Sequence, residues 1–463
     1  MDSIQNLTSS AADRLAALSS PVIDAGHTEY DAARHTFYHG LDRHPALVAR
    51  PVDAAEVAQV IAAARETGLP LAVRSGGHGA AGHSAWDGSL VLDLSAMKAI
   101  DIDPGRRTAW AETGLTAAEY TTATAEHGLV TGFGDTGSVG IGGITLGGGL
   151  GLLHRSQGLT IDSVLAADIV TADGRQLRVD DENHPDLFWA IRGGGGSFGV
   201  VTRFLYRLHP VSHVVGGMLA FHATAEVAAA VLAEAEHAPD ELSGVVTVMT
   251  LPPMPELEPR FHGRVAVGMI MVHSGSIDDG NRVFDRFRAI AEPIIDLVQV
   301  LPYQVMLQGP EPPQPPFAAD RTWFSEGVDT DTMAWVIDGV AASTAPMRVV
   351  QIRPLGGAVA RVAPDATAFG HRNRRLMLVV GAGYTDPAER ERHVAWVDSM
   401  VAAIGRDDGA AYVNFLSDAS EDEVRAAYPA TTWQRLTEVK GQYDPDNVFR
   451  LNHNIPPAPD HTT

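Results

Sequence analysis

The sequence predicts an α+β protein, and two changes of pattern along the chain support this fold class. Up to about residue 210 the chain predicts short helices and strands separated by glycine-rich loops. Between about 211 and 405, long helical patterns alternate with strands, which is typical of an antiparallel sheet covered by helices. The remaining residues return to short elements. We therefore expect a main domain over 1–210, an α+β domain over 211–405 and a C-terminal segment over 406–463.

Composition and charge limit the possible functions. The chain has 463 residues, 45% hydrophobic and 20% charged, as in soluble globular proteins of two or three domains. Its net charge of −23 argues against nucleic acid or an anionic membrane as a partner. No cysteine is present, which excludes disulfides and thiolate metal sites, and we expect no metal. We see no signal peptide and no membrane-spanning apolar run, so we expect a cytoplasmic protein.

Local signals place the elements of the first part. Residues 51–69 predict an amphipathic helix with Asp53 as its N-cap, and Thr116 caps a helix that runs to about His127. The dipeptide Asp173-Gly174 between two alternating segments predicts a β-hairpin. The remaining expected strands lie at 71–73, 90–94, 164–171, 176–179 and 200–208, two short strands flank Asp103-Pro104-Gly105, and a short helix lies at 186–191.

The central part predicts longer elements. The expected helices are 225–237, 279–291, 330–342 and 387–404. The expected strands are 245–251, 265–272, 349–354 and 376–382. A proline-rich run over 309–317 predicts a loop. In the C-terminal segment, Ser420 to Glu423 form a capping box and residues 433–443 predict a second helix.

Three glycine-rich tracts carry the strongest functional signal. Arg74-Ser75-Gly76-Gly77-His78 follows a buried strand, and further tracts lie at 137–151 and 192–199. Glycine lets backbone N–H groups approach a bulky anionic ligand, so three such loops predict a long phosphate-bearing cofactor. None of them ends in Gly-Lys-Ser/Thr, which excludes a P-loop. The tract at 140–145 also lacks the acidic residue that a Rossmann fingerprint requires.

The chain resembles the berberine bridge enzyme-like FAD-linked oxidases of the vanillyl-alcohol oxidase superfamily. The resemblance covers most of the chain. It rests on the first two glycine tracts and on the segments 87–95, 186–195, 412–415 and 443–452. It implies a PCMH-type FAD-binding domain built from both ends of the chain. The central domain would then bind the substrate over the flavin ring.

The resemblance also implies roles for individual residues. His78 matches the histidine that attaches to the flavin 8α-methyl group; a structural histidine beside a glycine loop is the alternative. The other positions implied to bind the cofactor are Arg74, Ser75, Gly76, Gly77, Thr136, Ser138, Val139, Gly140, Gly142, Gly143, Gly147, Gly199, Val200, Asn452 and Asn454. Backbone donors at such loops suit a diphosphate.

Two departures from the family pattern affect the chemistry. Many relatives hold the flavin through a second link from a cysteine, whose position here is Thr136. The resemblance therefore implies one covalent link, through His78 only. Relatives often have a catalytic tyrosine at the position of Phe415, which cannot accept a proton.

Three residues remain as catalytic candidates. Tyr412 and His371 could each take a proton, although a tyrosine packed in an interface and a polar strand-edge histidine are the alternative interpretations. Asn414 could hydrogen-bond the substrate or the flavin, or could hold a turn. His83 and His154, near the glycine loops, are interpreted as structural.

The expected reaction is oxidation of a C–H bond next to oxygen or nitrogen of a small alcohol, sugar or secondary metabolite. Hydride would pass to flavin N5, and reoxidation by O2 would give H2O2. In relatives a valine at position 139 accompanies oxygen access, which favours an oxidase over a dehydrogenase. A non-catalytic binding protein of the same fold is a third hypothesis. The sequence identifies neither the substrate nor the oligomeric state.

Overall fold

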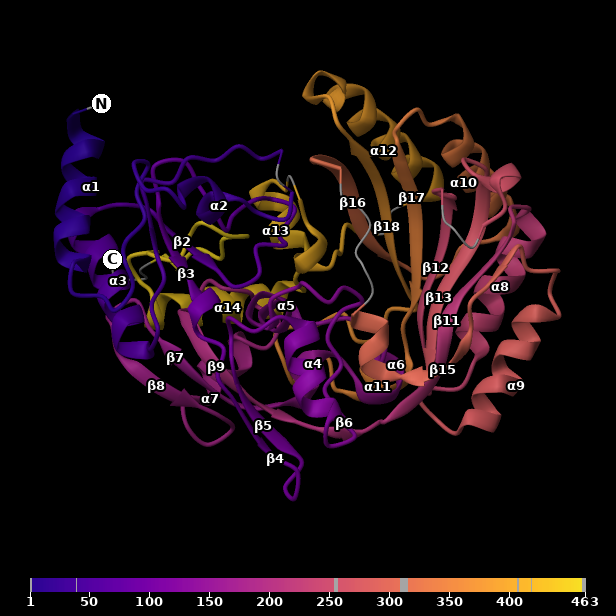
Figure 1. Ribbon diagram of the computed structural model, residues 1–463, viewed down its shortest axis with the longest axis horizontal. Coiled ribbons are helices and arrows are strands. Elements are labelled where there is room, and N and C mark those ends of the chain that lie inside the picture. The colour runs from indigo at the N-terminus through magenta and orange to yellow at the C-terminus, as the bar shows by residue number, and fades with distance from the viewer. Residues whose placement is uncertain are drawn as a thin grey trace.

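The computed structural model describes residues 2–38, 40–253, 257–308, 315–405, 408–417 and 419–459, with no side-chain description for residues 2–4. Two lobes stand side by side (Figure 1). One contains both ends of the chain, and the other is built around a large sheet from the central part. The predicted α+β class, with an antiparallel sheet covered by helices, is confirmed.

A small parallel sheet begins the first lobe. Strands β1 (Leu47–Ala49), β3 (Leu90–Asp93) and β2 (Leu71–Arg74) pair in that order. Helix α3 (Ala54–Thr67) packs on them, and the Asp53 side chain accepts a hydrogen bond from Glu56 N at its start, as predicted. Helices α1 (Asp2–Leu15) and α2 (Tyr30–Arg34) precede this unit.

An antiparallel sheet of five strands completes the lobe's framework. Its order is β4 (Ile100–Asp103), β5 (Thr108–Glu112), β9 (Val200–Arg207), β7 (Val164–Val170) and β8 (Gln176–Val179). The predicted hairpin joins β7 to β8, and Gly174 takes a φ of 84°, which suits glycine in this turn. The remaining elements are α4 (Ala117–Ala125), β6 (Leu129–Val130), α5 (Ile141–Gly147), α6 (His154–Gln157), α7 (Pro185–Ala190) and β10 (His209–Pro210).

The second lobe is an eight-stranded antiparallel sheet. Its strand order is β14 (Ile295–Asp296), β11 (His213–His222), β13 (Val265–His273), β12 (Leu242–Thr250), β17 (Met347–Pro354), β18 (Leu376–Tyr384) and β16 (Phe317–Ser325), and β15 (Gln299–Pro302) also pairs with β11. Four helices cover the outer face: α8 (Ala225–His237), α9 (Ile277–Arg288), α10 (Thr330–Ala342) and α12 (Arg390–Ile404). Strands β11 and β16 lie where the sequence predicted no strand. The proline-rich run lies outside the described residues except for 315–317, and Phe317 begins β16.

Alternation along the strands assigns each side chain of this sheet to a face. On β16, Ala319 and Trp323 join the core beneath the helices, and Arg321 pairs with Asp398 of α12 at 3.2 Å. The alternate residues of β16 therefore face the first lobe. Phe324 does so, since it packs in a cluster with Leu150, Leu159 and Ile161 of that lobe.

The C-terminal segment packs into the first lobe. Helix α13 (Glu421–Ala426) begins at the predicted capping box, and α14 (Ala430–Tyr443) packs against α7. The yellow C-terminal ribbon runs among the indigo and purple elements (Figure 1). The Lys440 ammonium, fully buried, lies 2.6 Å from Asp444 and donates to Ser197 O at 2.7 Å. This contact ties the last helix to the third glycine tract. The central part also contains the short helix α11 (Gly357–Arg361).

Among the described residues, no helix has the length and apolar character needed to cross a membrane.

Candidate active site

The three glycine tracts meet at one cavity in the first lobe. Its lining includes Ser75, Gly79 and His83 beside the first tract, Gly142, Gly143 and Leu146 in the second, and Gly195, Gly196, Gly199 and Val200 in or next to the third. The C-terminal segment adds Val413, Asn414, Leu416, Asn452 and His453. Segments more than 300 residues apart in sequence thus form one surface.

Six glycines among the lining residues leave backbone open to this cavity, between apolar side chains such as Leu146 and Val200. A Cβ atom added at Gly79, Gly143 or Gly195 would meet no protein atom within 4 Å. Asn454 Oδ1, next in the chain to the lining residue His453, is buried without a hydrogen-bond partner among the described residues. A cofactor with phosphate groups needs open backbone and unused polar atoms of this kind, so the residues present fit FAD.

The first two tracts are locked against each other. A Cβ atom at Gly76 would lie 2.2 Å from Gly140 N, so these glycines allow the two loops to touch. Ser75 Oγ donates to Thr113 O at 2.6 Å and accepts from Gly142 N at 3.3 Å. Arg74 instead pairs with the buried Asp93 at 2.8 Å, so its side chain braces the loop.

His78 is held by two side chains. Its ring stacks on Phe37 with centroids 4.0 Å apart, and Nε2 lies 2.8 Å from Ser138 Oγ. The Phe37 amide donates to Gly77 O at 3.0 Å, which joins the two segments. Thr136, at the position of the relatives' cysteine, lies two residues before Ser138. Val139 is half-buried, and its carbonyl accepts from Ala117 N.

Asn414 lines the cavity, whereas Tyr412 is buried behind it. Asn414 donates to Ile144 O and to the Tyr412 hydroxyl at 3.0 and 2.9 Å. A Cβ atom at Gly147 would lie 2.0 Å from Asn414 Oδ1, so glycine is required there. The Tyr412 hydroxyl also accepts from Gly149 N at 2.7 Å, and burial raises its pKa to about 12.

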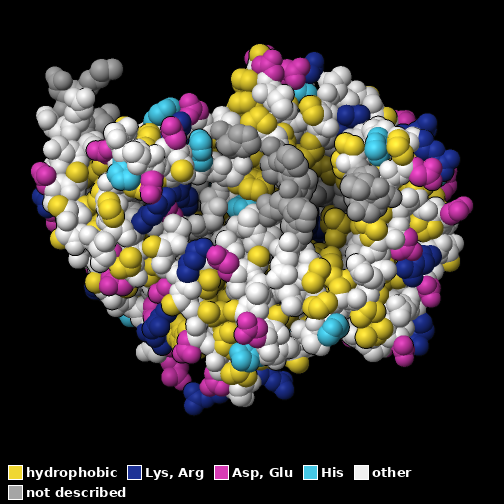
Figure 2. Space-filling view, in the orientation of Figure 1, with side chains coloured by type: hydrophobic (Ala, Val, Ile, Leu, Met, Phe, Trp, Pro, Cys, Tyr) yellow, Lys and Arg dark blue, Asp and Glu magenta, His cyan; other side chains and the backbone are white. Residues whose placement is uncertain are grey.

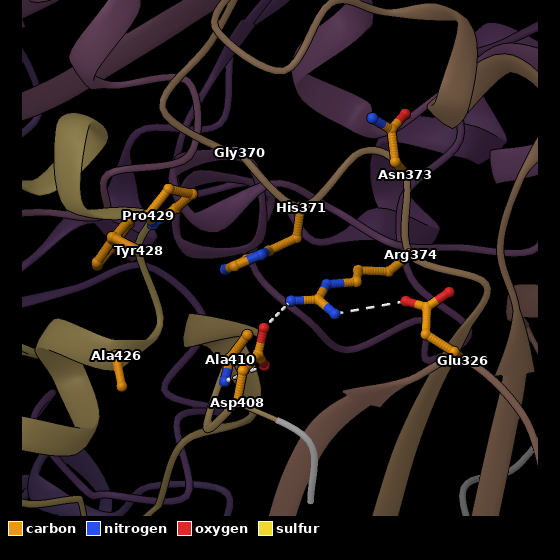
Figure 3. A pocket seen from close by; sticks show the side chains of 10 residues that line it. All are labelled: Glu326, Gly370, His371, Asn373, Arg374, Asp408, Ala410, Ala426, Tyr428 and Pro429. Atoms are coloured by element: carbon orange, nitrogen blue, oxygen red, sulfur yellow. Dashed lines mark hydrogen bonds and ion pairs between the residues drawn. The ribbon is translucent and has the colours of Figure 1, made fainter.

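His371 lies at a different pocket (Figure 3). That pocket is lined by Glu326, Arg374, Asp408 and Tyr428 among others and shares no residue with the glycine-lined cavity. His371 Nε2 lies 2.8 Å from Ala427 O, and burial lowers the pKa of its ring. The structure therefore does not bring His371 together with Asn414.

The sequence did not reveal the charged residues that face the cavity's lobe from the large sheet. Arg353 of β17 pairs with Asp135 at 2.8 Å, donates to Gln351 Oε1 at 2.8 Å and lies over the Phe415 ring at 5.2 Å. Asp320 of β16 lies on the same face. Alternation within a strand could have grouped Gln351 with Arg353, but their side of the sheet depends on tertiary packing. Figure 2 shows a hollow between the lobes. The described residues contain no cluster of His, Asp and Glu suited to a metal.

Two family models match the chain. A model described as an FAD binding domain matches residues 45–180, and one described as berberine and berberine like matches residues 411–456. The first match contains the first two glycine tracts, and the second contains Tyr412, Asn414 and Asn452.

Known proteins resemble the whole chain. An uncharacterised FAD-linked oxidoreductase of Bacillus subtilis is 28% identical over 95% of this chain and 97% of its own. The crystal structure of 6-hydroxy-D-nicotine oxidase from Arthrobacter nicotinovorans is 25% identical, covers 96% of this chain and 99% of its own, and has a TM-score of 0.84. Glucooligosaccharide oxidase from Acremonium strictum, whose title names a 6-S-cysteinyl, 8α-N1-histidyl FAD, has a TM-score of 0.85 at 20% identity, covering 97% and 99%.

Proposed function

We propose that the chain is a berberine bridge enzyme-like FAD-linked oxidoreductase and that it acts as an oxidase on a small organic substrate. The meeting of three glycine tracts and the C-terminal segment at one cavity carries this proposal. The substrate would lie between this cavity and the inner face of the large sheet, and it carries a C–H bond next to oxygen or nitrogen.

The chain's own residues account for holding the cofactor. Backbone of the glycine tracts would bind the diphosphate, since Gly79, Gly143 and Gly195 leave their backbone open to the cavity. Asn452 and Asn454 would add side-chain contacts from the C-terminal segment. When bound, FAD would supply the acceptor for hydride and pass the electrons on.

His78 would attach the cofactor by a single covalent bond. The stack on Phe37 and the contact with Ser138 fix the orientation of its ring. No cysteine exists in the chain, so a second link of the kind named for glucooligosaccharide oxidase cannot form here. Acid precipitation of the purified protein should leave a yellow pellet with the mass of one added FAD. A flavin that passes wholly into the supernatant would contradict attachment.

O2 would be the electron acceptor, and Val139 supports this part of the proposal because it leaves more room than leucine would. The test is peroxide production in air with a panel of alcohols, amines and sugars that includes xylobiose and (R)-6-hydroxynicotine, which relatives' names and titles mention. We expect at least one compound to bleach the flavin anaerobically and to yield H2O2 in air. Bleaching without peroxide, with activity restored by an artificial dye, would identify a dehydrogenase instead. If no compound bleaches the flavin, the proposed function is wrong for these substrate classes.

A further inference from the structure

Asp320 is a half-buried acid on the inner face of the large sheet. Its neighbours on β16, Ala319 and Arg321, belong to the outer side, where they meet the core beneath the helices and Asp398. Alternation therefore directs the Asp320 side chain toward the first lobe. Its Oδ1 atom is buried and has no hydrogen-bond partner among the described residues.

A buried carboxylate oxygen without a hydrogen-bond partner is costly for a folded protein, so its presence requires a reason. Burial raises the pKa of Asp320 to about 6, against the lowering effects of the Ser417 hydroxyl and the Arg321 guanidinium. An acid in this state changes its charge near neutral pH. Acids whose pKa is shifted toward neutral pH are typical of proton transfer.

Two segments of the first lobe reach Asp320. Ser417, which follows the Tyr412 to Phe415 motif, has its Oγ 3.4 Å from Asp320 O. Tyr38 lies close enough for the Asp320 charge to contribute to the rise of its pKa to about 12, which burial mainly causes. Tyr38 adjoins Phe37, the residue that stacks on His78. Asp320 thus lies where the segment after Phe415 and the loop of Phe37 and Tyr38 meet the sheet.

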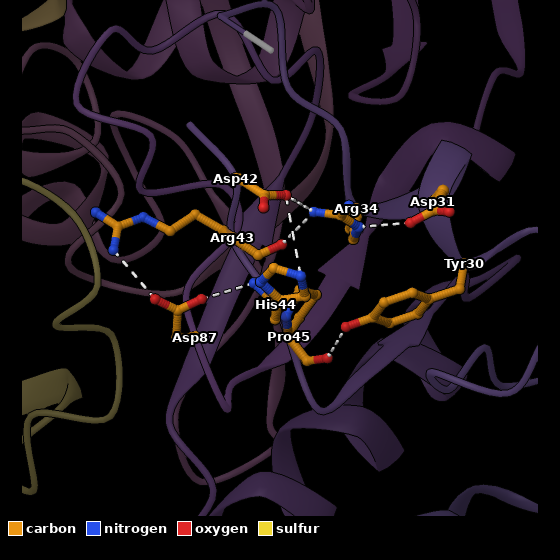
Figure 4. A network of polar contacts seen from close by, with 8 residues as sticks. All are labelled: Tyr30, Asp31, Arg34, Asp42, Arg43, His44, Pro45 and Asp87. Carbon is orange, nitrogen blue, oxygen red and sulfur yellow. Dashed lines mark hydrogen bonds and ion pairs between the residues drawn. The ribbon is translucent and has the colours of Figure 1, made fainter. Parts of the chain in front are cut away.

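The loop that carries Phe37 and Tyr38 is anchored on both sides. Gly40 N donates to Pro316 O at 3.0 Å, just before β16. Around the loop, Arg34 pairs with Asp31 and Asp42, Asp87 accepts from His44 N, and Tyr30 donates to Pro45 O (Figure 4). Such anchors fix the loop relative to the sheet.

No side chain of β18 lies directly across from Asp320. Its cross-strand neighbour on β18 is Gly381, which has no side chain, and the next residue in the row is Val349 of β17. A Cβ atom at Gly381 would meet only Val349, at 3.4 Å. Arg353, Met377 and Phe324 form another row on the same face, and Phe324 lies four residues along β16 from Asp320. Of the described residues, Tyr38 is the titratable group near Asp320 on this face, whereas Arg321 acts on the carboxyl from the outer side of β16.

The other candidate proton acceptors are less suited to this step. Phe415 has no ionisable group. The Tyr412 hydroxyl already accepts hydrogen bonds from Gly149 N and Asn414, and His371 lies at the separate pocket. Asp320 alone among these combines a free buried oxygen with a position between the lobes.

We propose that Asp320 is the catalytic base: its carboxylate accepts a hydrogen bond from the substrate's hydroxyl or amine and takes that proton. The inference rests on the proposed function. In this oxidation, the O–H or N–H proton of the substrate moves to Asp320. The neighbouring C–H bond breaks, and its electron pair moves as hydride to oxidised FAD. A C=O or C=N bond forms in the substrate. Asp320 then loses its proton to solvent.

The test uses flavin-loaded wild type and the variants Asp320→Asn and Asp320→Glu. Anaerobic flavin reduction by the panel compound that reduces wild type fastest is followed from pH 5 to pH 8.5. We expect the wild-type rate to rise with pH around a midpoint near 6. In Asp320→Asn the rate of anaerobic flavin reduction should be about 10²–10⁴-fold lower and should no longer rise with pH. Asp320→Glu, which keeps the carboxyl, should retain a pH rise at a reduced rate.

Asp398→Asn is the matched control, since it makes the same change on the other side of β16, where Asp398 pairs with Arg321. It should keep the wild-type rate and profile. An infrared titration adds a readout without turnover: a carboxyl with a midpoint near 6 should be present in wild type and Asp398→Asn and absent in Asp320→Asn.

Three results would overturn the proposal. An Asp320→Asn rate within a few-fold of wild type, with the same pH profile, would remove Asp320 from proton transfer. A change only in the substrate concentration for half-maximal rate would assign it to binding. If no panel compound reduces wild type, the proposed function fails and the base fails with it, whereas the first two results leave the oxidase standing.

Discussion

The glycine-lined cavity, which we call the cofactor cradle, and the inner face of the large sheet lie across the same hollow. The two surfaces are built in different ways. The cradle leaves glycine backbone open to the cavity, and the loops behind it are locked by close contacts such as Gly76 against Gly140. The sheet face presents side chains, and one of them, Asp320, has an oxygen without a hydrogen-bond partner in the described part of the chain. A fixed surface suits a cofactor that all members of a family bind. Side chains on the sheet face can instead differ between members and so select different substrates.

The buried ion pair behind the cradle gives the largest expected effect. Lys440→Met would leave the Asp444 carboxylate buried without its cation, although Val448 N and Phe449 N would still donate to it. We expect a loss of about 3–5 kcal/mol in the free energy of unfolding. Thermal or denaturant unfolding measures it. Lys98→Met, which removes the exposed pair with Glu119, should cost about 0–1 kcal/mol. Equal losses of unfolding free energy in both variants would show that the buried pair does not stabilise the fold more than an exposed pair does.

The same contrast separates what the sequence could predict from what it could not. The cradle was predictable because glycine tracts are local signals whose meaning does not depend on distant residues. Strand β16 was missed because Asp320 and Arg321 interrupt its apolar pattern directly after a proline-rich run. Strand β11 was missed where Gly216 and Gly217 weaken the strand pattern. The role of Asp320 depends on Ser417, Tyr38 and Gly381, which only tertiary packing brings near it.

Burial of the Asp320 carboxyl on the sheet face should make the free energy of unfolding depend on pH. The folded-state pKa of Asp320, about 6, lies above the value of about 3.9 expected in the unfolded chain. Its contribution is therefore fully present below about pH 4 and is lost as the pH rises through 6. The difference amounts to roughly 3 kcal/mol at most.

Unfolding of wild type and Asp320→Asn at pH 4, 5, 6 and 7.5 checks this. Relative to the variant, wild type should lose stability over that range and then stay level above about pH 7. A difference between the two proteins that does not change with pH would show that Asp320 has an ordinary pKa.

Tyr412→Phe tests whether this residue belongs to the cradle or to the chemistry. The change leaves Gly149 N and the Asn414 amide without their shared acceptor, in a buried setting. We expect a loss of about 1–3 kcal/mol in stability and a rate of anaerobic flavin reduction within a few-fold of wild type. A fall in that rate of 10²-fold or more, with normal flavin content, would return Tyr412 to the role of base.

The smallest change in stability should come from Gly143→Ala, and it tests the cradle most directly. Gly143 lies in α5, and an added methyl group would meet no protein atom within 4 Å. Alanine is favoured over glycine within a helix, so the flavin-free protein should be as stable as wild type or more stable by up to about 1 kcal/mol. The methyl group would instead project into space that we assign to the cofactor, so the purified variant should retain less flavin. Gly76→Ala provides the contrast, because its methyl group would collide with Gly140 N and should lower both stability and flavin content. Absorbance at the flavin band per mole of protein, together with unfolding of each flavin-free variant, separates the two effects. A Gly143→Ala protein with full flavin content would mean that the cofactor does not pass this backbone.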